Sequence, residues 1–253
     1  MEENKRARIL KMRVDVTSYG AVTRNIMAMS QCGSGRYVCV SNVHMCMEVF
    51  DDPVFCRIVN NADLVVPDGR PLVWAQKLMG WKQATQVRGS DLLLKICNEA
   101  MIREIPIGLY GGTEKSLSVF VNFLKMNFAK LKVNLAISPP FRNLTEEEKN
   151  YTEEINRSGV GILFVGIGCP KQEKWMAKHK AALNCVMIGV GAAFDFFSGE
   201  KKHAPIWMQR SGLEWLFRLV SDPKRLWKRY LIYNPRFIYH LMRQIMTRGE
   251  FPA

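Results

Sequence analysis

The segment ADLVVPDG, residues 62–69, places one carboxylate, Asp68, directly after a run of apolar residues. Pro-Asp-Gly is ordinary turn chemistry and Asp caps helices well, so one interpretation of Asp68 is a turn. The other is catalytic, because a carboxylate that ends a buried strand loses water and its pKa can rise toward that of a general base. Asn42 ends another apolar run, RYVCVSN, and could orient a hydroxyl group beside Asp68.

Glycines follow three further apolar runs, in LYGGT, GIGCPKQE and GVGAAFDFFSG. Glycine lets backbone N–H groups approach a phosphate, and a following helix N-terminus adds partial positive charge. Each run taken alone is better explained as a tight turn from strand to helix. Three such runs at one sheet edge favour a nucleotide pocket, with Gly111, Gly112 and Gly168 as candidate contacts. None matches GxGxxG with its acidic residue or GxxxxGK[ST], which disfavours a dinucleotide site and a P-loop.

Three polar residues, Lys171, Gln172 and Glu173, follow Gly168 in the first turn of a predicted helix. A cation there opposes the helix dipole, so Lys171 is not placed for helix stability. The amide of Gln172 can donate and accept hydrogen bonds, as recognition of a base or a sugar requires. A solvated helix start is the competing interpretation of these residues.

Two other aspartates are candidate substrate-binding residues, but each also fits a structural role. Asp91 in RGSDLLL also fits, with Ser90, the start of a helix that runs to Glu104. Asp195 in AAFDFFSG lies between two phenylalanines, where a carboxylate needs partners. It is therefore either a structural hydrogen-bonding centre or a site residue.

The sequence predicts neither a metal nor a cofactor. Its seven cysteines form no CxxC pair and no Cys/His cluster with zinc spacing, and no D-x-D is present to chelate a divalent ion on a diphosphate. His44, His179 and His203 are isolated in the sequence and fit ordinary polar histidines. Charge on a leaving phosphate would then have to be neutralised by side chains.

Suitable basic side chains are concentrated near the C-terminus. Residues 201–253 hold 11 Lys/Arg against three Asp/Glu and carry +8 of the net charge of +13. Arg218, Arg225 and Arg229 are spaced to lie near one face of a continuous helix, and guanidinium groups bind phosphate at two points. Trp and Tyr residues interleave with these bases, as in elements that lie among lipid headgroups. The alternatives are an amphipathic helix pair packed on the core and a surface that holds RNA or DNA.

Short apolar runs alternate with segments of helical period along most of the chain. Runs as hydrophobic as GILFVGIG and CVMIGVG suit strands that helices cover on both faces. We therefore predict a doubly wound, mainly parallel α/β domain of Rossmann-like type over residues 1–199, with its ligand beyond the carboxyl ends of the strands. The alternation stops after Gly199, which predicts a helical C-terminal appendage over residues 200–253.

Local signals mark some of the predicted helix starts. Thr145 and Glu148 form a T-x-x-E capping box, and Pro170 occupies a first-turn position that a helix tolerates. Asp222 before Pro223 marks a new helix within the appendage.

The location of the protein is predicted to be cytoplasmic, at the inner face of the cell membrane. The segment MEENKRARILKMRV has no apolar core typical of a secretory signal, and no stretch approaches the ~18 apolar residues of a membrane span. An odd, unpatterned set of cysteines is typical of reduced thiols. The basic, aromatic appendage would bind the anionic membrane surface.

Seven motifs occur in a fixed order between about residues 14 and 237: VPDG, RGSDLL, LYGGTEKS, GIGCPKQEKW, GVGAAFDFFSG, HAPIWMQRSGLEWLFRL and DPKRLWKRY. Together they resemble the WecG/TagA/CpsF family of glycosyltransferases. The resemblance implies transfer of a sugar from a UDP-sugar to a saccharide linked by diphosphate to a polyprenol, with inversion and without a metal. The product would belong to a cell-surface polysaccharide or exopolysaccharide.

The resemblance also implies roles for individual residues. Asp68 would deprotonate the acceptor hydroxyl and Asn42 would assist. The appendage would supply cations to the donor diphosphate and touch the membrane. Those cations would be Arg218, Arg225 and either Lys228 or Arg229. Ser41, in the Val40-Ser41-Asn42 position, and Arg88, in RGSDLL, are further candidate substrate-binding residues. Many members of the family read T-x-N where this chain reads Val40-Ser41-Asn42, so the identity of the donor sugar stays open.

A basic α/β protein that binds nucleic acid is the alternative function. It would use the appendage alone, and it would not need the glycine-rich turns, PDG or PKQE. For this reason we expect no nucleic acid partner. An incompletely covered pocket would leave room for contacts between subunits of a homo-oligomer.

Overall fold

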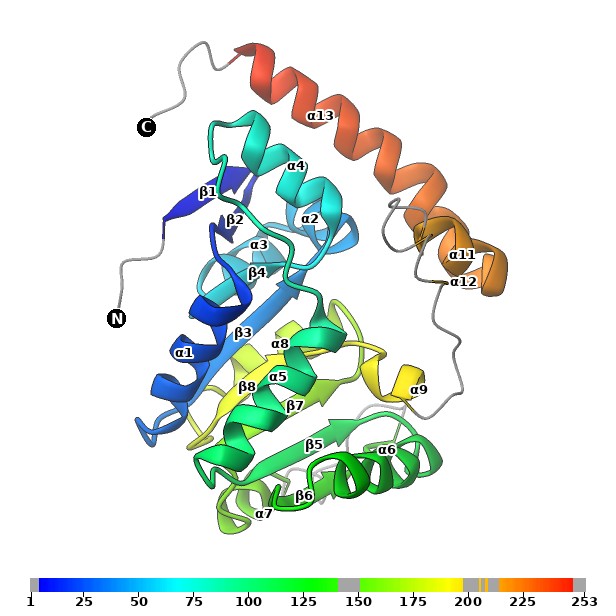
Figure 1. Cartoon of the computed structure of the whole chain (residues 1–253). Helices are drawn as coiled ribbons and strands as arrows, with labels where there is room; N and C mark the ends of the chain where they lie inside the picture. Colours follow the sequence, from blue (N-terminus) through cyan, green and yellow to red (C-terminus); the bar gives the residue numbers. More distant parts are fainter. Residues whose placement is uncertain (1–4, 141–150, 198–204, 206–207, 209–213, 248–253) are drawn as a thin grey trace.

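The computed structural model describes residues 5–140, 151–197, 205, 208 and 214–247, and its centre is a six-stranded sheet (Figure 1). The strand order is β4-β3-β8-β7-β5-β6, and every neighbouring pair is parallel. The strands are β3 (Arg36–Ser41), β4 (Leu64–Pro67), β5 (Ile107–Gly111), β6 (Val133–Ile137), β7 (Ile162–Gly166) and β8 (Val186–Gly189). The predicted parallel α/β sheet is confirmed.

Helices cover both faces of this sheet. Successive side chains of a strand point to opposite faces, so a strand that is apolar throughout needs helices on both sides. In β3, Val38 and Val40 belong to one hydrophobic cluster, whereas Tyr37 and Cys39 belong to the other. The first cluster includes residues of α1 (Tyr19–Ser30), α5 (Gly89–Ile102), α6 (Glu114–Asn127) and α9 (Ala193–Phe197). The second includes residues of α2 (Val43–Asp51), α3 (Pro53–Asn60), α4 (Arg70–Leu78), α7 (Tyr151–Arg157) and α8 (Lys171–His179). The predicted capping box at Thr145 and Glu148 lies outside the described residues.

The chain leaves the neighbouring strands β3 and β8 toward opposite faces of the sheet. After β3 it enters α2, which packs in the second cluster, and after β8 it enters α9, which packs in the first. This is a topological switch point, the place where open α/β sheets form a crevice for ligands.

The C-terminal segment forms helices that pack on the sheet domain. These are α11 (Glu214–Ser221), α12 (Pro223–Trp227), the π-helical segment η2 (Lys228–Tyr233) and α13 (Asn234–Thr247), so the helix start predicted at Asp222-Pro223 is confirmed. Phe237 and Leu241 of α13 are buried in the cluster that holds α2 and α4. The guanidinium of Arg236 donates to both carboxylate oxygens of Asp51 in α2, at 2.8 and 3.0 Å. Part of the predicted appendage therefore belongs to the core.

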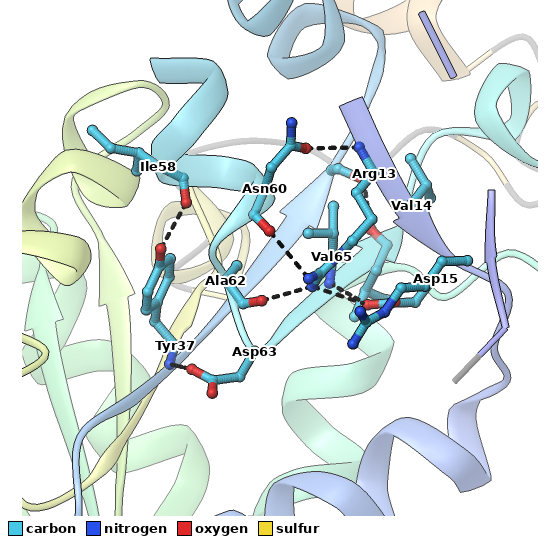
Figure 2. Close-up of polar contacts among 12 residues, drawn as sticks. Arg13, Val14, Asp15, Tyr37, Ile58, Asn60, Ala62, Asp63 and Val65 are labelled. Carbon is cyan, nitrogen blue, oxygen red and sulfur yellow. Dashed lines mark hydrogen bonds and ion pairs between the residues drawn. The ribbon is translucent and has the colours of Figure 1, made fainter. Parts of the chain in front are cut away.

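An antiparallel hairpin of β1 (Arg6–Ile9) and β2 (Met12–Asp15) braces the start of β4 (Figure 2). The fully buried Asp15 accepts a 2.7 Å hydrogen bond from the backbone N–H of Val65. Arg13 lies 3.6 Å from the same carboxylate and donates to the backbone carbonyl of Ala62 at 2.6 Å. Burial raises the pKa of Asp15, while Val65 and Arg13 act in the opposite direction. This network fixes β4, the strand that directly precedes Asp68.

Replacing Asp15 by alanine should lower the free energy of unfolding by about 3 kcal/mol, because the Val65 N–H and the Arg13 guanidinium lose a buried acceptor. Asp15→Asn should lose less, since it retains an acceptor and removes a charge that burial disfavours. Urea unfolding of both variants measures the difference. A free energy of unfolding unchanged in Asp15→Ala would show that the network does not hold β4.

Candidate active site

A pocket of about 1490 Å³ lies where the carboxyl ends of the sheet strands meet the C-terminal helices. Its walls come from the turns after β3, β4, β7 and β8, from α4 and the start of α5, and from α11, η2 and α13. Pockets for one small molecule are usually ~300–1,000 Å³, so this one has room for more than one substrate. It includes the crevice between β3 and β8.

Asp68 lines this pocket and also lies in the turn between β4 and α4. Its Oδ1 accepts a 2.8 Å hydrogen bond from the N–H of Gly89, the first residue of α5. A helix N-terminus interacts favourably with a carboxylate, so this contact holds Oδ1 of Asp68 at the start of α5. The two interpretations of Asp68 are therefore compatible.

Asn42 lies beside Asp68 because β3 and β4 are in register. Ser41 pairs with Pro67, and the N–H groups of Asp68 and Gly69 both donate to the Ser41 carbonyl, at 2.9 and 3.2 Å. Asn42 caps α2, since its Oδ1 accepts from the N–H of Met45 at 3.2 Å. Its amide Nδ2 makes no hydrogen bond within the described part of the chain, which leaves it available to a substrate in the pocket.

At the pocket wall, the side chain of Gln172 links α8 by a hydrogen bond to the glycine turn that follows β8. Its Oε1 accepts from the N–H of Gly191 at 3.1 Å, and its Nε2 donates to Oε1 of Glu173 at 2.6 Å. The predicted first-turn position of both residues is confirmed. Glu173 is fully buried, and burial raises its pKa to about 7, although hydrogen bonds from Gln172 and Cys169 act in the opposite direction.

Four cationic side chains from the predicted set line the pocket: Arg88, Arg218, Lys228 and Arg229. The guanidinium of Arg218 lies 4.9 Å from the centre of the Phe196 ring. Lys228 and Arg229 belong to the π-helical segment, a feature frequent at functional sites. Gly168 also lines the pocket. Positive charge from α11 and η2 thus shares one cavity with Asp68.

Other candidate residues do not line the pocket. The hydroxyl of Ser41 is buried and donates to the Val66 carbonyl at 2.9 Å, and Asp91 accepts from the Tyr19 hydroxyl at 3.1 Å on the surface. The remaining residues outside the pocket lining are Lys171, Glu173, Gly111 and Gly112. A Cβ on Gly111 would lie 2.5 Å from the backbone of Gly166, so close contact between β5 and β7 explains that glycine. The side chains of Asp195 and Arg225 lie outside the described part of the structure.

The structure adds His44 to the pocket. Its ring stacks on Tyr233, with ring centroids 5.6 Å apart. Burial and, to a smaller extent, the charge of Arg229 lower the pKa of His44 to about 4, although a hydrogen bond with the Cys169 backbone acts in the opposite direction. His44 is therefore neutral near pH 7. Its position two residues after Asn42, in the first turn of α2, was the signal in the sequence.

Arg70 and Trp74 on α4 also line the pocket and were not among the predicted residues. Arg70 directly follows the PDG turn and is partly buried. It makes no hydrogen bond or ion pair among the residues that the structure describes. In the same part of the chain, no group of three His, Cys, Asp or Glu side chains is placed to hold a metal ion.

The raised pKa of Glu173 should make stability depend on pH. The folded value of about 7 exceeds the ordinary value of 4.5, so the folded protein binds more protons between these values, and the free energy of unfolding falls as the pH rises through them. The loss should be on the order of 3 kcal/mol. Glu173→Gln can still accept the hydrogen bond from Gln172, and should be more stable than the unchanged protein at pH 8.

Urea unfolding between pH 5 and pH 8 measures this effect, with Glu153→Gln as a control at an exposed position of α7. The control should keep the pH dependence of the unchanged protein. The same pH dependence in Glu173→Gln would mean that another group titrates.

Comparison with known proteins covers nearly the whole chain. Residues 7–250 match the glycosyl transferase WecG/TagA/CpsF family. A protein of Bacillus spizizenii is 27% identical over 198 residues, which cover 78% of this chain and 75% of that protein. A protein of Bacillus subtilis is 25% identical over 218 residues, which cover 86% and 83%. Both are named N-acetylglucosaminyldiphosphoundecaprenol N-acetyl-beta-D-mannosaminyltransferase. The family match includes the sheet, the pocket and α13, and this chain belongs to the WecG/TagA/CpsF family of glycosyltransferases.

Proposed function

We propose that this glycosyltransferase moves a sugar from a UDP-sugar to a saccharide on a polyprenyl diphosphate, with inversion and without a metal, in the synthesis of a cell-surface polysaccharide. The observation that carries the proposal is the position of Asp68, which lies in one pocket with the cations of α11 and η2. The relatives' name supports an acceptor of this class, since it describes a sugar on diphosphoundecaprenol.

In the proposed reaction, Asp68 takes the proton from the acceptor hydroxyl. The oxygen forms a bond to the anomeric carbon of the donor sugar, on the face opposite the nucleotide. The bond between that carbon and the diphosphate oxygen breaks, and UDP leaves with the electron pair. The configuration at the anomeric carbon is thereby inverted. Asn42, with its free amide, would hold the acceptor hydroxyl toward the carboxylate.

The departing UDP carries negative charge that has to be stabilised in the transition state. Arg218, Lys228 and Arg229 line the pocket from the C-terminal helices and would supply this stabilisation. Arginine binds a diphosphate through two N–H groups at once, whereas lysine contributes a point charge. Three such cations would stabilise the negative charge of the diphosphate, as a divalent metal ion does in other enzymes. For this reason the proposal includes no metal.

The nucleotide would lie in the crevice between β3 and β8. The turns at Gly168 and Gly191 approach there without side chains, and Gln172 fixes the second of them through its hydrogen bond to the Gly191 N–H. Both glycines have positive φ angles, 85° and 59°, which other residues rarely adopt. This backbone could approach a diphosphate closely.

Asp68→Asn should retain the fold, because the amide oxygen can still accept from the Gly89 N–H, yet should lose transfer by a factor of about 10²–10⁴. Glu114→Gln is the control, since Glu114 is an exposed carboxylate at the start of α6 and lies outside the pocket lining. UDP release with a water-soluble polyprenyl-diphosphate-sugar analogue measures both. Full activity in Asp68→Asn would exclude it as the base.

We further propose that residues 200–253 bind the inner face of the cell membrane and complete the site of the sheet domain, residues 1–199. Large apolar side chains on α11, α12 and α13 face solvent, among them Val220 at 74%, Trp227 at 42% and Tyr239 at 63% exposure. Basic residues lie between them, a combination that suits an anionic lipid surface. In the described part of the chain, no helix is long and apolar enough to cross a membrane.

Replacing Val220, Trp227 and Tyr239 together by serine should reduce co-sedimentation with anionic vesicles by at least tenfold, because three insertable side chains are lost. None of the three lines the pocket, so UDP release with a water-soluble acceptor should persist. Met126→Ser, an exposed position on α6, is the control. Tighter binding of single-stranded RNA or DNA than of vesicles by the unchanged protein would favour the nucleic-acid alternative.

A further inference from the structure

The pocket that contains Asp68 is also lined by residues of α4 and α13, whose positions in the fold are labelled in Figure 1. On α4, the residues that line it include Arg70, Trp74 and Leu78, at intervals of four. On α13, Ile238 and Met242 line it at the same interval. Residues four apart lie on one helix face, so each helix presents one face to the same channel.

The outer part of this channel has apolar walls that face solvent. Trp74 is 56% and Leu78 60% exposed on α4, and Ile238 is 59% and Met242 50% exposed on α13. Large exposed apolar side chains that line one pocket lose contact with water when an apolar ligand enters it. We refer to the part of the pocket that these four residues line as the apolar channel.

Arg70 lies between the apolar channel and the catalytic turn. It is the first residue of α4, two residues after Asp68, and its guanidinium has no hydrogen-bond or ion-pair partner within the described part of the chain. A partly buried guanidinium at a pocket wall is suited to bind phosphate oxygens. The anion would then lie between the proposed base and the apolar walls.

Asp68 and the pocket-facing residues of α4 thus present three chemical groups in order along the chain. The base lies just before the helix, the cation is at its first residue, and the apolar side chains follow over about 12 Å of helix. The acceptor class in the proposed function has the same order: a sugar hydroxyl, a diphosphate and a lipid.

We propose that α4 and α13 form the acceptor site, in which Arg70 binds the acceptor diphosphate and the apolar channel holds the first isoprenoid units of the polyprenyl chain. This inference rests on the proposed function and deepens it. It assigns the two diphosphates to different residues. Arg70 would bind the diphosphate of the acceptor, whereas Arg218, Lys228 and Arg229 would bind the diphosphate of the donor.

A lipid chain fits the channel better than other occupants. A peptide would bring backbone N–H and C=O groups, which need partners that the four apolar side chains do not provide. A second copy of the chain seated there would cover four side chains that line the pocket of Asp68. A flexible hydrocarbon needs only apolar walls and leaves its headgroup in the pocket.

The test compares two acceptors that carry the same sugar diphosphate, one on a farnesyl chain and one on a single dimethylallyl unit, with a fixed UDP-sugar. In the unchanged protein the farnesyl acceptor should have a KM at least tenfold lower. Trp74→Ala and Leu78→Ser should each remove most of this advantage by raising the farnesyl KM. The KM for the dimethylallyl acceptor should rise much less, because that acceptor occupies only the part of the channel nearest Arg70, and the KM for the UDP-sugar should not change.

Met246→Ser is the matched control, since Met246 is exposed one turn further along α13 and does not line the pocket. It should keep the preference for the farnesyl acceptor. An equal KM for both acceptors in the unchanged protein, or loss of the preference in Met246→Ser, would overturn the channel assignment and indicate general contact with lipid. Absence of UDP release with either acceptor would instead refute the proposed function.

Arg70→Gln tests the anion site separately. It should raise the KM of both acceptors about tenfold and leave the KM of the UDP-sugar unchanged, because only the acceptor diphosphate loses a contact. Arg57→Gln, at an exposed arginine of α3 outside the pocket, should change none of these values. A higher KM for the UDP-sugar in Arg70→Gln would reassign Arg70 to the donor.

Discussion

The register between β3 and β4 is the constraint on which the site depends. Ser41 pairs with Pro67, and its carbonyl accepts from two consecutive N–H groups, those of Asp68 and Gly69. This places Asn42 and Asp68 next to each other and directs the Asp68 carboxylate to the first N–H of α5. A slip by one residue would turn every side chain of the strand to the opposite face. The buried Asp15 opposes such a slip, because it holds the N–H of Val65 within the same strand.

The pocket combines groups from distant parts of the sequence, because the edge of a parallel sheet supplies only some of what group transfer needs. Its turns offer backbone N–H groups and the Asp68 carboxylate, whereas much of the positive charge comes from α11 and η2. Those helices are held in place by α13. Phe237 is buried in the core and Arg236 pairs with Asp51, so a side chain in η2 is positioned by contacts made one to two turns later.

The fold could be predicted from the sequence because alternating apolar and helical segments depend on local residues alone. The same is true of the PDG turn and of the first turn of α8, where Gln172 lies. Which side chains reach the pocket depends on the direction of each strand and on how distant segments pack together, and no short segment determines either. Ser41 and Asn42 are neighbours in sequence, but the strand directs the Ser41 hydroxyl to the Val66 carbonyl and leaves only Asn42 in the cavity. His44 was isolated in the sequence and becomes a pocket residue because Tyr233 of η2 stacks on it.

One rigid helix can set the distance between the chemistry and the lipid. Because α4 begins at the turn that carries Asp68, Trp74 and Leu78 lie at fixed distances from the carboxylate, without an intervening loop. A lipid seated against that face would bring its diphosphate to Arg70 before the sugar reaches the base. The outer walls are shared with α13, whose Tyr239 faces solvent beside them. A chain that leaves a bilayer along α13 would then enter the channel from the side that the proposal places against the membrane.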